Sequence, residues 1–200
     1  MERVLFSKPV QFCLLAVAVF LVVACSPKLN WRTVQSPEQR YTALFPGKPD
    51  KLERLISLGE QEFRQTLEAV KIDDDIYSIS TIEIPAQQAG IDLIKKITAQ
   101  LQSNLLDRAK ASGGIVISEP AYFQNSQHQR IQTIDYYLVL NQANKAQQAM
   151  RVRWITRFDN NKSVWVYQAS VLHTNANTGD VKTLLSKEEY ANFFNEFVPE

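Results

Sequence analysis

One long amphipathic segment separates two runs of strand-like sequence, and this order constrains the fold more than any other feature of the chain. Within Ile91–Ala111, Ile94, Ile97 and Leu101 recur at helical spacing, so the segment is predicted to be the one long helix. The Ser-Gly-Gly sequence at 112–114 is predicted to end it. Strands grouped before and after a single helix are typical of an α+β domain with an antiparallel sheet rather than of a βαβ fold.

The strand predictions come from short apolar stretches bounded by turn-forming residues. Before the helix they cover residues 31–35, 41–45, 55–58, 64–72 and 76–84, the last two forming a hairpin around Asp73-Asp74-Asp75. After it they cover residues 115–119 and 121–123, 129–140, 150–158 and 163–172. A final helix is predicted over residues 186–197, with Ser186 as its N-cap and four aromatic side chains directed inward: Tyr190, Phe193, Phe194 and Phe197.

Two short motifs resemble those of the PsbP-like α/β/α sandwich domains. Residues 41–49 read Tyr-Thr-Ala-Leu-Phe-Pro-Gly-Lys-Pro, where that family often has F-x-V-x-F-P-x-x-P. Residues 193–197 read Phe-Phe-Asn-Glu-Phe, where it often ends in F-F-x-S-F, so Asn195 departs from the common Ser. With the Asp-rich hairpin and the helix ending in Gly-Gly, the resemblance covers roughly residues 31–198. It implies one long and one C-terminal helix packed on an antiparallel sheet, and a binding or assembly role without a specified partner.

The N-terminus has the composition of an export signal. Arg3 and Lys8 precede an unbroken apolar run of 13 residues, Phe12–Ala24. A helix that spans a membrane needs roughly 20 apolar residues. Residues 1–24 are therefore predicted to be a signal peptide that is removed, rather than a membrane-spanning helix.

The sequence Leu-Val-Val-Ala-Cys at residues 21–25 resembles the lipobox of bacterial lipoproteins. The resemblance implies that the Cys25 thiol is alkylated with a diacylglyceryl group and that cleavage occurs before it. Two or three acyl chains, such as palmitate, anchor a protein stably where one chain is marginal. Ser26, not Asp, follows the cysteine, which favours the outer membrane, facing the periplasm, if the bacterium is Gram-negative. The alternatives are that Cys25 is a buried core cysteine, or that the segment is an ordinary signal peptide in which Cys25 is incidental.

The predicted organisation is a signal peptide over residues 1–24, a lipidated tether over 25–30 and a single α+β domain over 31–200. The 176 residues that remain after cleavage are enough for one core but short for two. Five extended residues after Cys25 reach at most about 17 Å, so we expect the domain to lie close to a membrane.

Charge and cysteine content exclude several classes of function. Cleavage removes Arg3, Lys8 and Glu2, so the 22 basic and 21 acidic residues of the chain become 20 of each. A neutral domain has no electrostatic basis for binding nucleic acid. Cys13 leaves with the signal peptide and Cys25 is modified, which leaves no cysteine for a disulfide, a zinc site or a nucleophile.

Motifs for catalysis or metal binding are also missing from the sequence. The Asp73-Asp74-Asp75 run lacks the Gly and Glu that an EF-hand loop requires at positions 6 and 12. The only histidines, His128 and His173, occur without a G-x-S-x-G or H-E-x-x-H motif. Gly113-Gly114 lacks the context of a phosphate-binding loop. We therefore expect no metal, no cofactor and no enzymatic activity.

Three arginines in the predicted strand 150–158 alternate with apolar residues. A period of two places Arg151, Arg153 and Arg157 on one face of the sheet. One interpretation is an exposed face with carboxylate partners on neighbouring strands, with Asp135 among the candidates. The other is a docking stripe for anionic lipid head groups or an acidic partner.

These patterns favour a non-enzymatic, lipid-anchored protein of the cell envelope that binds or positions another envelope component of unknown identity. One alternative is a membrane-tethered small hydrolase, which requires His128 or His173 beside a Ser and an Asp. The other is a carrier of lipid or another small ligand, which requires an apolar cavity of several hundred Å³. A binding module instead predicts an exposed patch with apolar or aromatic content.

Overall fold

The computed structural model describes residues 29–59, 61–141, 143, 146–176 and 179–200. The chain divides into two compact units, residues 1–30 and 31–200, and every described helix and strand belongs to the second unit. The predicted signal peptide and Cys25 lie outside the described residues. Within the described ranges, no helix combines the length and the hydropathy that crossing a membrane requires.

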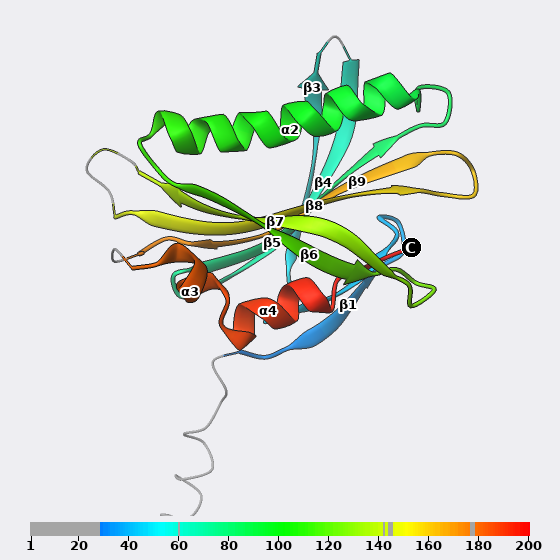
Figure 1. Ribbon diagram of the computed structural model, residues 1–200. Coiled ribbons are helices and arrows are strands. Elements are labelled where there is room, and N and C mark those ends of the chain that lie inside the picture. The colour runs from blue at the N-terminus through cyan, green and yellow to red at the C-terminus, as the bar shows by residue number, and fades with distance from the viewer. Residues whose placement is uncertain (1–28, 60, 142, 144–145, 177–178) are drawn as a thin grey trace, which may run out of the picture. The chain divides into compact units, whose positions relative to one another are not determined.

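A seven-stranded antiparallel sheet forms the centre of this unit, with strand order β3-β4-β5-β9-β8-β7-β6 (Figure 1). Its strands are β3 (Asp50–Leu58), β4 (Gln61–Ile72), β5 (Asp75–Ile84), β6 (Val116–Gln124), β7 (Arg130–Leu140), β8 (Gln148–Phe158) and β9 (Val164–His173). The prediction of an α+β fold with an antiparallel sheet is confirmed. Strand β3 begins at Asp50 rather than at the predicted residue 55. The prediction missed its first half because those residues are exposed and four of the five are charged, with Leu52 as the one apolar residue.

One long helix, α2 (Ile91–Ala111), crosses one face of this sheet with the predicted bounds (Figure 1). Near its start, Ile94 and Ile97 pack against a cluster that includes Phe63 of β4, whereas near its end Ala109 packs against residues of β7 and β8. Gly114 lies so close to β7 that a Cβ there would meet the Val139 carbonyl oxygen at 1.8 Å. Only glycine therefore allows the chain to pass from the helix into β6 at this point.

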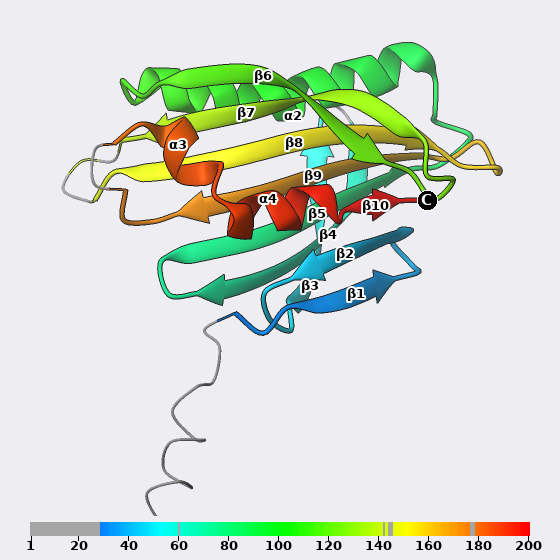
Figure 2. The same cartoon turned by 60° about the horizontal axis from the view of Figure 1, so that its bottom comes forward.

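The opposite face carries a small sheet and two short helices (Figure 2). The small sheet has the order β1-β2-β10 and comprises β1 (Arg32–Ser36), β2 (Tyr41–Phe45) and β10 (Val198–Pro199). The helices are α3 (Val181–Leu185) and α4 (Glu188–Asn195). Aromatic residues fill this layer, and the four that the sequence placed inward are buried there: Tyr190, Phe193, Phe194 and Phe197.

The predicted start of the last helix is wrong. Asp180 caps a short helix that the sequence did not predict, accepting a hydrogen bond from the Lys182 N–H at 3.1 Å. Ser186 is the C-cap of that helix, α3, and Lys187 is the N-cap of α4. The error arose because Ser186 precedes two glutamates, which is also the pattern expected at the start of a helix.

Candidate functional site

Arg151 and Arg153 do not form an exposed stripe. The residues are only 7% and 2% exposed, and both side chains bind Asp135, which is 2% exposed. The Nη2 of Arg151 lies 2.6 Å from Asp135 Oδ2, and the Nε of Arg153 lies 2.6 Å from Asp135 Oδ1. Asp135 is thus the partner that the first interpretation named, but the exposed face that both interpretations assumed is wrong for these two residues. Helices α3 and α4 cover this face of β8.

The two guanidinium groups also hold the ends of these helices. Arg151 Nη1 donates to the carbonyl oxygen of Leu185, the last residue of α3, at 3.2 Å. Arg153 Nη1 donates to the carbonyl oxygen of Phe194 in the last turn of α4, at 2.9 Å. The last carbonyls of a helix lack partners within it and carry partial negative charge, which compensates the second positive charge of this group. We call Asp135, Arg151 and Arg153 the arginine cluster, and its position indicates a structural role.

Arg157 lies apart from the arginine cluster. It is partly buried, opposite Trp165 of β9, and its Nε has no hydrogen-bond partner among the described residues. The three arginines share a face of β8, as the alternation predicts, but only two of them act together.

The histidines are also separated. His173 Nδ1 lies 2.7 Å from Asp75 Oδ1, and the Tyr190 hydroxyl donates to the same carboxylate at 3.1 Å. Burial, with the charge of Asp75 as the next cause, raises the pKa of the Tyr190 hydroxyl. No serine hydroxyl in the described part of the chain bonds to His173. His128 is exposed in the turn between β6 and β7.

The most distinctive feature of the sheet is that β7 separates from β8. The two strands pair from Leu140↔Gln148 to Asp135↔Arg153, and no further. Beyond that pair, β8 continues to Phe158 beside β9, and β7 extends back to Arg130 beside β6. We call the opening between residues 130–134 of β7 and residues 154–158 of β8 the sheet fork.

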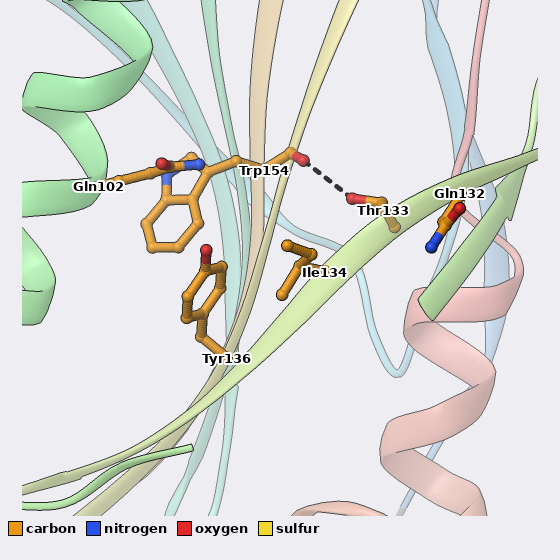
Figure 3. A pocket seen from close by; sticks show the side chains of 6 residues that line it. All are labelled: Gln102, Gln132, Thr133, Ile134, Tyr136 and Trp154. Carbon is orange, nitrogen blue, oxygen red and sulfur yellow. Dashed lines mark hydrogen bonds between the residues drawn. The ribbon is translucent and has the colours of Figure 1, made fainter. Parts of the chain in front are cut away.

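Two local features produce the sheet fork. At its apex the Thr133 hydroxyl donates to the Trp154 carbonyl oxygen at 3.2 Å, where continued pairing would place a main-chain bond (Figure 3). At its far end, the turn between β6 and β7 is attached to β10, because Ser126 N donates to the Pro199 carbonyl oxygen at 3.3 Å. The β6–β7 hairpin is therefore held toward the small sheet while β8 stays with β9.

A pocket of about 390 Å³ lies at the sheet fork, on the side of α2. Tyr136 and Trp154 face it with their rings in a T-shaped arrangement, 5.4 Å between centroids (Figure 3). Ile134 lies next to them on β7 and is 45% exposed. The remaining lining residues are Gln102 of α2, and Gln132 and Thr133 of β7. None of the six side chains carries a formal charge, so the pocket suits an uncharged ligand that offers both apolar and hydrogen-bonding groups.

A second, mainly apolar pocket of about 330 Å³ lies between α3 and the adjoining ends of β7 and β8. Its apolar lining includes Val139, Ala149, Ala176, Val181 and Leu184. Its size and lining match what a carrier of a small apolar ligand requires.

Metal binding finds no support in the described residues, where no three His, Cys, Asp or Glu side chains gather as ligands. Comparison with known proteins adds no assignment, since no family model and no curated protein matches this sequence.

The sequence did not predict the sheet fork. Pro120 indicates only that β6 is an edge strand, because a proline within a strand removes a main-chain donor. The separation of β7 from β8 depends on the attachment of a distant turn to β10, which no local sequence pattern predicts.

Proposed function

We propose that this chain is a lipid-anchored protein of the cell envelope and that its α+β domain is a non-enzymatic binding module. In this proposal, the sheet fork receives an uncharged part of another envelope component. The observation that carries it is the pocket at the fork, where aromatic, apolar and amide side chains surround a space free of charged groups. Such a mixture is typical of binding sites.

The anchor in this proposal is the lipid on Cys25, which the apolar run before that residue supports. The domain begins at Trp31, whose ring packs on Tyr77 with 6.1 Å between centroids. Tyr77 pairs with Val171 near the end of β9, whereas the sheet fork lies beside the start of β9. Trp31, the first residue of the domain, therefore lies toward the end of the sheet opposite the fork.

We further propose a relationship to the PsbP-like domains. Support comes from the layers, with α2 on one face of the sheet and the aromatic helix α4 on the other, and from the Phe-Pro-Gly sequence that ends β2. The small sheet and α3 are not part of that resemblance. The resemblance itself rests on short motifs.

Site-specific photo-crosslinking in cells tests the binding role. A photoreactive phenylalanine analogue replaces Gln132, which is exposed in the fork, or Lys95, which is exposed on α2 as the matched control. We expect a reproducible adduct from position 132 that is absent from position 95. The adduct should disappear when Ile134→Asp adds a charge to the pocket. Equal adducts from both positions, or none from position 132, would contradict the proposal.

The apolar pocket beside α3 favours a carrier of a small apolar ligand as the second candidate. Leu184→Trp would fill this pocket, since Leu184 is only partly buried at its edge. In that case a fluorescent fatty acid should bind the original chain and not the Leu184→Trp variant. Unchanged binding in the variant would count against this candidate.

A further inference from the structure

We propose that an extended polypeptide segment, with uncharged side chains on the side of α2, binds in the sheet fork by adding as a strand to the free edge of β8. This inference rests on the proposed binding function and specifies the chemistry of the partner. Strand addition uses main-chain hydrogen bonds for affinity and alternate side chains for specificity.

Main-chain groups of β8 point into the fork. In an antiparallel strand, the N–H and C=O of one residue point to the same edge, and successive residues alternate between the two edges. Asp159 N donates to the Ser163 carbonyl oxygen at 3.0 Å, so odd-numbered residues at this end face β9. The Trp154 carbonyl oxygen accepts from Thr133 of β7, so even-numbered residues face the fork. Thr156 and Phe158 therefore direct main-chain groups into the fork, where no described strand pairs with them.

Main-chain groups of β7, the opposite wall of the fork, also point into the fork. Val139 N donates to the Ile115 carbonyl oxygen at 2.9 Å, so odd-numbered residues of β7 face β6. The register between these strands is continuous, which directs the main-chain groups of Gln132 toward β8. An extended segment in the fork would thus meet hydrogen-bonding main chain on both sides, and only another polypeptide supplies the matching alternation of donors and acceptors.

The outer edges of the sheet are protected from such pairing, unlike the fork. On β6, Pro120 lies opposite Ile134, an even-numbered position, so its missing N–H falls on the outer edge. On β3, four of the first five residues are charged: Asp50, Lys51, Glu53 and Arg54. Proline and charge are common devices that prevent strand addition. The free edge of β8 carries neither at Thr156 or Phe158.

The side chains around the fork define the segment. On the side of α2, the pocket is uncharged; Ile134 in its lining is 45% exposed, and Phe158 at the end of β8 is 60% exposed. On the other side, Arg40 pairs with Asp159 at 3.3 Å, whereas the Nε of the partly buried Arg157 has no hydrogen-bond partner among the described residues. Successive side chains of a strand point to opposite faces. The segment should therefore place apolar or amide side chains at every second position, toward α2, where the pocket lining carries no charge.

Hydrogen exchange tests the free edge without any ligand. In the full chain in detergent micelles, the amide protons of Thr156 and Phe158 should exchange much faster than those of Ile155 and Arg157, which face β9. Equal protection of all four amides would show that the edge is already occupied and would overturn the proposal.

A random twelve-residue peptide library displayed on phage provides the probe, selected against the full chain in micelles. We expect peptides with apolar or amide side chains at alternate positions that slow exchange at Thr156 and Phe158. Thr156→Pro, which removes the fork-facing N–H, should weaken binding at least about tenfold. Thr156→Val, which keeps the N–H and loses only the hydroxyl, should stay within about threefold. If no selected peptide slows exchange at Thr156 and Phe158, strand addition to β8 is wrong.

N-methylation of the selected peptide keeps the test decisive if Thr156→Pro fails to fold. Methyl groups on alternate amides should abolish binding when they lie on the amides that face β8, and should weaken it less on the amides that face β7, where the fork offers fewer main-chain groups. Binding at the fork that tolerates both patterns would refute strand addition while the photo-crosslink from position 132 still supports the binding function. Absence of that crosslink would instead contradict the binding function itself.

Discussion

Replacing Asp135 by Asn should destabilise the domain far more than a surface ion pair would. Asp135 accepts four hydrogen bonds, from the Nε and Nη2 atoms of Arg151 and Arg153, at 2.6 to 3.0 Å. The Asp135→Asn side chain keeps one oxygen acceptor and loses the negative charge, so two buried guanidinium groups remain without a counter-ion. Removing one partner of a buried ion pair costs about 3–5 kcal/mol, whereas an exposed pair contributes about 0–1 kcal/mol.

Urea denaturation of the full chain in micelles, followed by far-UV circular dichroism, measures this loss. A domain of this size is stable by about 5–15 kcal/mol, so Asp135→Asn should shift the midpoint strongly without abolishing folding. Combining Asp135→Leu with Arg151→Met and Arg153→Met should recover much of the stability, because apolar groups of similar volume need no counter-ion. A loss below about 1 kcal/mol for Asp135→Asn would refute the buried arginine cluster.

Three further predictions concern other parts of the chain. Cys25→Ala should abolish incorporation of a palmitate analogue in cells, and equal labelling of both proteins would exclude lipidation at Cys25. Gly114→Ala should lower the free energy of unfolding by at least about 1–3 kcal/mol in the same denaturation assay, because the new Cβ meets the Val139 carbonyl. Gly90→Ala is the control and should change it little, because no atom lies within 4 Å of the new Cβ. The free energy of unfolding should also fall above about pH 10. Burial raises the pKa of four tyrosine hydroxyls in the folded state, so only the unfolded chain ionises at the ordinary pKa. Unchanged stability above about pH 10 would contradict the burial of these hydroxyls. These residues are Tyr41, Tyr77, Tyr167 and Tyr190.

The sequence predicted those elements whose own residues carry the information. Helix α2 was predicted closely because the apolar stripe formed by Ile94, Ile97, Leu101 and Leu105 repeats at helical spacing and Gly113-Gly114 follow the helix. The hairpin of β4 and β5 was predicted because two apolar strands flank a run of aspartates. Helix α3 was missed because five residues are too few to show a period of 3.6.

The arginine cluster shows where such prediction ends. Alternation correctly places Arg151 and Arg153 on one face of β8, opposite Val152 and Trp154. It does not tell which face is covered, because that depends on where α3 and α4, more than 30 residues later in the chain, return to the sheet. Because arginines are usually exposed, the prediction placed this face at the surface. In the structure, the Asp135 carboxylate and the ends of two helices bind the arginines within the core.

The arginine cluster and the sheet fork meet at a single register pair. Asp135↔Arg153 is the last pair of β7 with β8, and the hydrogen bond from Thr133 to Trp154 lies immediately beyond it. The cluster therefore holds the two strands together up to the apex, while the attachment of Ser126 to Pro199 holds them apart beyond it. Because Arg153 also binds the end of α4, the position of that helix and the position of the apex are fixed by the same guanidinium group. The buried charges thus set where the fork opens, although they do not line the pocket on the side of α2.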